Sequence, residues 1–194
     1  MAKSIGKKIN TAIFISGSGS NLHSIIKNSF KKKFPAEIKL VISNNKFAKG
    51  LMYAKQYNIE HKFVNSTKIN LFEKKFLNIV KKKKIKLICL AGFMKILSDK
   101  FIKGFKYKIL NIHPSLLPKY KGLNTHKKAI ENNDKFSGCT VHFVTKKLDS
   151  GKIILQKKVK INKKETETSL KKKVLKVEHS IYSKAIKIVL KTSY

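Results

Sequence analysis

The sequence has no arginine and few acidic residues. All 45 basic residues are lysine, against 10 aspartates and glutamates, which gives a formal net charge of +35. Such a charge favours nucleic-acid binding, because basic surfaces release counterions from phosphates. Arginine is nevertheless the usual bidentate partner of guanine and phosphate, and the lysines are scattered along the whole chain. We therefore interpret the charge as a composition bias with anion attraction as a secondary effect, and expect no specific nucleic-acid partner.

Cysteines and long apolar segments are also scarce. Cys89 and Cys139 lie inside apolar runs without the spacing of metal ligands, so we expect small core residues in a reducing compartment. No apolar stretch approaches membrane-spanning length. The run from Ala12 to Ile15, after the basic N-terminus, meets a glycine turn and no cleavage site. The sequence therefore predicts a cytoplasmic protein that does not associate with a membrane.

The 194 residues suit one domain with a substantial core, and neither repeats nor Pro/Ser-rich linkers divide them. In the first half, short apolar runs alternate with amphipathic segments. Strands are predicted over 12–15, 38–42, 62–64, 87–90 and 108–110, and helices over 20–28, 49–57 and 71–82. This alternation predicts an α/β fold with a doubly wound, mostly parallel sheet and helices on both faces.

The pattern changes after Pro114 and Pro118. A helix is predicted over 124–132, followed by two facing strands over 138–144 and 153–161 and a final amphipathic helix over 167–190. We therefore expect the sheet to end in an antiparallel pair.

The most informative segment is Asn111-Ile112-His113-Pro114, which places an amide and an imidazole two residues apart at the end of an apolar run. In an extended chain both side chains point the same way. The prolines put the pair at a strand-to-loop transition, where open α/β sheets bind ligands. An amide that donates to a developing oxyanion, beside a group titrating near neutrality, suits acyl transfer. The alternative is a turn whose polar side chains are hydrogen-bonded within the protein and play no part in catalysis.

A glycine loop, Gly17-Ser18-Gly19-Ser20-Asn21, follows the first predicted strand and opens the first predicted helix. Backbone N–H groups and the positive end of the helix dipole would then point at one spot, which predicts an anion site. Ser20 would cap the helix or contact an oxygen of the anion. The loop matches neither a Walker A motif nor the dinucleotide fingerprint, and a simple tight turn is the alternative.

Two further segments carry candidate residues. Ala91 to Leu97 follows another predicted strand, and its apolar side chains suit either a slot for a flat heteroaromatic ligand or ordinary core packing. Asp149 lies in a loop between two predicted strands. If Asp149 approaches His113, it favours the imidazolium and raises the pKa of the ring, whereas turn formation alone also explains an aspartate there. His142 is expected to point from a sheet face.

Taken in order, these segments closely resemble the phosphoribosylglycinamide formyltransferase family, the folate-dependent enzymes of purine synthesis. The resemblance spans nearly the whole chain and is carried by residues 15–22, 90–97, 111–122, 141–143 and 148–151. It implies a Rossmann-like fold in a single domain over 1–194, with a phosphate-binding half at about 1–100 and a folate-binding and catalytic half at about 101–194. It also implies transfer of the formyl group of 10-formyltetrahydrofolate to the amine of glycinamide ribonucleotide.

The resemblance further implies roles for individual residues, without a metal. The catalytic group would be Asn111, His113 and Asp149; the ribonucleotide would contact Gly19, Ser20, Asn21 and Glu178; and the folate would contact Met94, Lys95, Ile96, Leu97 and Asn111. The chain departs from the family at two places. Ile69 beside Lys68 stands where the family has an arginine near the folate, and Leu175 replaces a polar residue one turn before Glu178.

Three alternatives remain open from the sequence. The 10-formyltetrahydrofolate hydrolases resemble the chain but carry an extra N-terminal regulatory domain, and the methionyl-tRNA formyltransferases carry a C-terminal tRNA domain and lack the glycine loop. A non-catalytic basic module that binds nucleic acid is the third. We expect the transferase, acting on small molecules as a monomer or homodimer.

Overall fold

The computed structural model describes residues 7–64 and 69–191. The strands there are β1 (Ile9–Ile15), β2 (Ala36–Ser43), β3 (His61–Phe63), β4 (Leu87–Leu90), β5 (Lys108–His113), β6 (Phe136–Phe143) and β7 (Ile153–Lys160). The helices there are α1 (Ser20–Ser29), α2 (Gly50–Gln56), α3 (Ile69–Lys82), α4 (Asp99–Gly104), α5 (Thr125–Glu131) and α6 (Glu167–Lys191).

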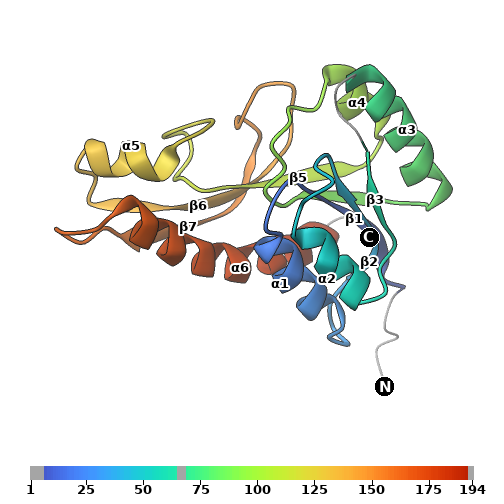
Figure 1. Cartoon of the computed structure of the whole chain (residues 1–194), viewed down its shortest axis with the longest axis horizontal. Helices are drawn as coiled ribbons and strands as arrows, with labels where there is room; N and C mark the ends of the chain where they lie inside the picture. The colour runs from blue at the N-terminus through green and yellow to red at the C-terminus, as the bar shows by residue number, and fades with distance from the viewer. Residues whose placement is uncertain (1–6, 65–68, 192–194) are drawn as a thin grey trace.

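The strands form one sheet in the order β3-β2-β1-β4-β5-β6-β7 (Figure 1). Strands β1 to β5 pair in parallel, whereas β6 is antiparallel to both β5 and β7. The predicted mostly parallel sheet with an antiparallel C-terminal pair is therefore confirmed. Its strand order reverses at β1 and β4, and loops that follow neighbouring parallel strands at such a point make the usual ligand crevice.

Helices cover both faces of the sheet because successive strand residues point to opposite sides. On β1, Ile13 and Ile15 pack in the same core cluster as residues of α1 and α6, whereas Ala12 and Phe14 pack with residues of α3 and α4. Figure 1 shows α3 and α4 together, away from α1, α2 and α6. The two cysteines are fully buried, and burial raises the pKa of both thiols to about 12. The prediction that they are core residues is confirmed.

The structure adds one helix that the sequence reading missed. Helix α4 has only six residues and begins after Ser98, whose hydroxyl accepts a hydrogen bond from Phe101 N at 3.1 Å. A polar N-cap followed by Asp99 is a recognisable start signal, but so short a helix shows little periodicity. In addition, β5 continues to His113, so Asn111 and His113 belong to the end of the strand itself.

The loops after β1 and β4 are joined at the same edge of the sheet. Ser16 N donates to Gly92 O at 3.1 Å, and Met94 N donates to Ser16 Oγ at 2.8 Å. Gly19 has φ 73°, and a Cβ there would lie 2.4 Å from the Cα of Gly50. Only glycine therefore fits at this entry to α1, and the glycine loop is held against the loop that carries the predicted folate contacts.

Candidate active site

Strand β5 brings the predicted amide and imidazole into register with β6. Asn111 lies opposite His142, and His113 lies opposite Thr140, in the antiparallel pair. His113 and His142 are only 5% and 2% exposed, so both rings are largely removed from water. Two histidines and an amide therefore lie together at the end of β5. The spacing of Asn111 and His113 predicted this placement for those two residues.

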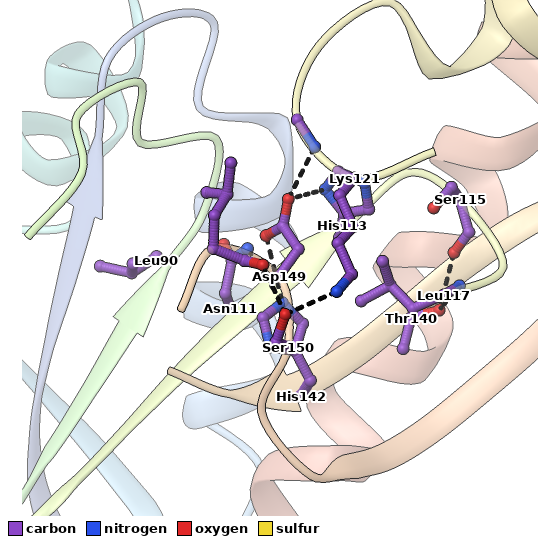
Figure 2. Close-up of polar contacts among 12 residues, drawn as sticks. Leu90, Asn111, His113, Ser115, Leu117, Lys121, Thr140, His142, Asp149 and Ser150 are labelled. Carbon is purple, nitrogen blue, oxygen red and sulfur yellow. Dashed lines mark hydrogen bonds and ion pairs between the residues drawn. The ribbon is translucent and has the colours of Figure 1, made fainter. Parts of the chain in front are cut away.

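Asp149 reaches this group from the loop between β6 and β7. Its Oδ2 lies 3.3 Å from His113 Nδ1, and its Oδ1 lies 3.6 Å from His142 Nε2. Gly122 N donates to Oδ2 at 2.9 Å. Figure 2 shows the carboxylate between the two rings, with Asn111 beside it. Asp149 has φ 44°, a conformation that aspartate and asparagine tolerate better than most residues. The expected approach of Asp149 to His113 is confirmed.

The second nitrogen of His113 faces a backbone carbonyl. Nε2 lies 2.8 Å from the oxygen of Tyr120, and a carbonyl oxygen can only accept a hydrogen bond. Nδ1 in turn faces the Asp149 carboxylate, which also only accepts, so the ring donates to both neighbours as an imidazolium and to one of them when it is neutral.

The pKa of His113 is shifted in the opposite direction from the one predicted. The pKa of His113 lies below its ordinary value of 6.5, because burial outweighs the raising effects of the Tyr120 carbonyl and Asp149, and the charge of His142 lowers it further. The prediction of a raised pKa was wrong in its net direction, although Asp149 acts in the predicted sense. The pKa of Asp149 is lowered: burial opposes this shift, but hydrogen bonds from His142 and Gly122 and the charge of His113 outweigh burial.

His142 is a site residue whose role the sequence reading missed. Its Nε2 lies 3.3 Å from Asn111 Nδ2, and its Nδ1 lies 2.9 Å from Phe143 O. The protonation of Nε2 decides whether the ring accepts from Asn111 or donates to Asp149. Alternation along β6 was the only sequence signal, and it placed the side chain on a sheet face without saying which neighbours it meets.

The loop after His113 is fixed by hydrogen bonds from the neighbouring strands. The Thr140 hydroxyl donates to Ser115 O at 2.7 Å and accepts from Leu117 N at 3.1 Å, as drawn in Figure 2. Gln156 donates to Leu117 O at 2.9 Å. Strands β6 and β7 thereby hold the segment that presents Tyr120 O and Gly122 N to the site.

The predicted ribonucleotide contacts also converge. Gly19 is the N-cap of α1, and Ser20 is the first residue of the helix. The first of the two predicted roles of Ser20, that of capping the helix, is therefore wrong. Asn21 Nδ2 donates to Glu178 Oε2 at 2.6 Å, across 157 residues of sequence, and both residues are 7% exposed. Burial raises the pKa of Glu178, while the bond from Asn21 opposes the shift. Among the residues that the structure describes, the buried Asn21 Oδ1 has no hydrogen-bond partner, so an acceptor beside Glu178 remains available to a ligand.

The predicted folate contacts divide into exposed and buried side chains. Met94 and Ile96 are 64% and 65% exposed, and Lys95 is also exposed, so all three are accessible to a ligand. Leu97 instead packs in the core and does not present its side chain. Lys68, beside the position of the family's arginine, lies outside the described residues, while Ile69 at that position begins α3.

Three features bear on nucleic acids, metal ions and membranes as partners. Exposed lysines occur on every helix from α1 to α6, which agrees with a composition bias. Within residues 7–64 and 69–191, no three His, Cys, Asp or Glu side chains form a group that could hold a metal ion. None of the helices in the described part of the chain is long and apolar enough to cross a membrane.

Comparison with known proteins agrees with this geometry. Residues 9–186 match the formyl transferase family model. The phosphoribosylglycinamide formyltransferase of Haemophilus influenzae is 44% identical over 93% of this chain and 86% of its own length, and that of Escherichia coli is 40% identical over 90% and 84%. The chain therefore belongs to the formyl transferase family.

Longer relatives and solved structures extend the comparison. The human trifunctional purine biosynthetic protein adenosine-3 is 38% identical over 94% of this chain, which spans only 18% of that protein's length. The crystal structure of phosphoribosylglycinamide formyltransferase from Anaplasma phagocytophilum superposes with a TM-score of 0.90 at 38% identity, covering 96% of this chain and 89% of the other. The enzyme from Brucella melitensis gives 0.91 at 38% identity, with 95% and 96% covered.

Proposed function

We propose that this chain transfers the formyl group of 10-formyltetrahydrofolate to the amine of glycinamide ribonucleotide, with Asn111, His113 and Asp149 as its catalytic residues. One observation carries the assignment of these residues: the carboxylate of Asp149 lies 3.3 Å from Nδ1 of a largely buried His113, beside the amide of Asn111. A base, a counter-charge and an oxyanion donor are the groups that acyl transfer to an amine requires.

The reaction begins when the amine lone pair of the ribonucleotide attacks the formyl carbon and the carbonyl electron pair moves onto oxygen. Asn111 donates a hydrogen bond to the negative oxygen, and because the donor is already in place, little reorganisation accompanies the charge development. His113 enters this step neutral, because burial keeps its pKa low. The ring therefore accepts a proton before it can donate one.

The proton lost by the attacking amine passes to the His113–Asp149 pair, directly or through water. The imidazolium is then held by Asp149 on one side and by the Tyr120 carbonyl on the other. Nitrogen is a poor leaving group unless it is protonated, so the same proton passes on to N10 of the folate as the C–N10 bond breaks. His113 thus ends neutral, and the tetrahydrofolate leaves with the proton that the amine brought.

The ribonucleotide would bind beside the glycine loop. Backbone N–H groups at the start of α1 suit its phosphate, and Glu178 on α6 offers a buried acceptor that Asn21 holds in place. The exposed side chains of Met94 and Ile96 lie on the neighbouring loop, where apolar surface suits the ring system of a folate.

Purified protein should formylate glycinamide ribonucleotide when 10-formyltetrahydrofolate is supplied, with one tetrahydrofolate released for each product formed. Product mass and folate absorbance are followed in parallel, and the same reaction without ribonucleotide measures transfer to water. We expect folate turnover to depend on the ribonucleotide. Equal turnover in its absence would instead identify a hydrolase, and the lack of any turnover, with retention of the protein on RNA, would favour a nucleic-acid-binding module.

A further inference from the structure

Tyr120 adopts an unusual backbone conformation next to the site. Its φ of 53° lies in the left-handed region, which an aromatic residue seldom occupies. Such a conformation is unfavourable and persists only where surrounding contacts enforce it. In this conformation the Tyr120 carbonyl points at His113 Nε2, 2.8 Å away.

The contacts that hold Tyr120 meet at Asp134, one of only three aspartates in the chain. The Tyr120 hydroxyl donates to Asp134 Oδ2 at 2.9 Å, and Lys119 Nζ lies 2.8 Å from Oδ1. Asp134 is itself fixed, because its backbone N–H donates to Ala129 O at the end of α5 at 3.0 Å. Burial opposes it, but the hydrogen bonds from Lys119 and Tyr120 lower the pKa of Asp134, so the acceptor is a carboxylate at neutral pH.

We propose that Asp134 is a positioning residue for His113: it holds the Tyr120 hydroxyl, and Tyr120 thereby keeps its carbonyl directed at Nε2. This contact fixes the orientation of the imidazole ring, so that Nδ1 remains the nitrogen that faces Asp149. The link to turnover rests on the proposed function, whereas the link to the titration of His113 does not.

Of the two side chains that contact Asp134, we expect Tyr120 to affect His113 and Lys119 to have little effect. The Lys119 side chain is 61% exposed, and an exposed ion pair contributes little to stability. Tyr120 is half-buried, and its hydroxyl is the contact that constrains the residue carrying the carbonyl. Loss of the tyrosine hydroxyl should therefore disturb His113, while loss of the lysine charge should not.

The direction in which the His113 pKa should change on loss of the Tyr120 hydroxyl follows from the contacts of the ring. The Tyr120 carbonyl raises the pKa of His113 against burial. The other titratable groups around the ring are Asp149 from the β6–β7 loop, His142 on β6 and His126 on α5. None of these is altered by removing the Tyr120 hydroxyl. A carbonyl released from Nε2 therefore lowers the pKa of His113 further.

The experiment compares Tyr120→Phe, Asp134→Asn, Asp134→Ala and Lys119→Met, with Tyr107→Phe as the matched control. Tyr107 is 47% exposed and packs edge-on against Phe105 before β5. The His113 pKa is read by NMR of histidine-labelled full-length protein, with its signal assigned by its loss in a His113→Asn variant. Turnover is measured by the formyl-transfer assay, and thermal unfolding reports whether each variant is folded.

We expect a lower His113 pKa in Tyr120→Phe and Asp134→Ala. Turnover should fall about three- to tenfold, the effect of losing the hydrogen bond between the neutral His113 ring and the Tyr120 carbonyl. Asp134→Asn keeps an oxygen that accepts from the hydroxyl, so it should retain most of the wild-type behaviour. Lys119→Met and Tyr107→Phe should stay within about twofold of wild type.

An unchanged His113 pKa in a folded Tyr120→Phe variant would overturn the proposal, and so would an equal effect of Lys119→Met. If Asp134→Ala unfolds, Tyr120→Phe decides, because it removes a single oxygen. If the wild type transfers no formyl group, the proposed function fails, but the NMR titration still tests the positioning role of Asp134.

Discussion

His113→Ala should lower kcat for formyl transfer by at least about a hundredfold, the usual contribution of a positioned acid-base group. In the proposed mechanism, the variant would lack the ring that receives the amine proton and returns it to N10 of the folate. Because the ring is not expected to bind the folate rings, affinity for a folate analogue should remain close to that of wild type. Steady-state kinetics and fluorescence titration with the analogue measure the two quantities separately.

The control for this variant is His61→Ala. His61 lies on the edge strand β3, is exposed, and contacts Ile59 O with Nδ1 at 3.1 Å. We expect its kcat to match wild type, which excludes a general effect of removing a histidine. Nearly full turnover in a folded His113→Ala variant would remove this residue from the mechanism.

Asp149→Asn should lose turnover and also shift the pH profile. The carboxylate charge favours the imidazolium, so its removal lowers the pKa of His113 below the already depressed value. Since the neutral ring is the active form in the free enzyme, activity is present above the His113 pKa and lost as pH falls through it. The acid limb of kcat/KM in wild type should lie below pH 6.5, and in the variant it should move to still lower pH.

We expect Asp149→Asn to reduce kcat by about ten- to a thousandfold, because the imidazolium loses its counter-charge. Asparagine tolerates the left-handed backbone at this position, so the loop should keep its shape. Asp99→Asn is the matched control, since Asp99 forms an exposed ion pair with Lys103 on α4. An acid limb that stays in place in Asp149→Asn would contradict the role given to its charge.

Sequence periodicity was sufficient for the fold and for much of the site. Apolar runs of strand length placed all seven strands of the described sheet, and the two-residue spacing of Asn111 and His113 placed both side chains at the end of β5. The glycine loop lies at the start of α1, as its position after the first strand predicted. These signals are local, and they predicted the strands correctly because central strands buried on both faces require continuous apolar runs.

Other features depended on contacts that no local pattern encodes. The carbonyl of Tyr120 and the amide of Gly122 belong to the backbone, so their residue types give no sign of their partners. The direction of the His113 pKa shift was mistaken because the sequence suggested the attracting carboxylate but not the burial of the ring. The sequence left both core packing and a ligand slot open for the side chain of Leu97, because core and pocket residues have the same apolar character, and the structure places that side chain in the core.

The most direct test of the central claim is a double-mutant cycle on kcat/KM between His113→Ala and Asp149→Asn. If Asp149 acts through His113, its substitution should cost little once the ring is gone, and the double variant should resemble His113→Ala alone. We expect this strong non-additivity. Losses that simply multiply in the double variant would mean that the two residues act independently, and Asp149 would then have no role through His113.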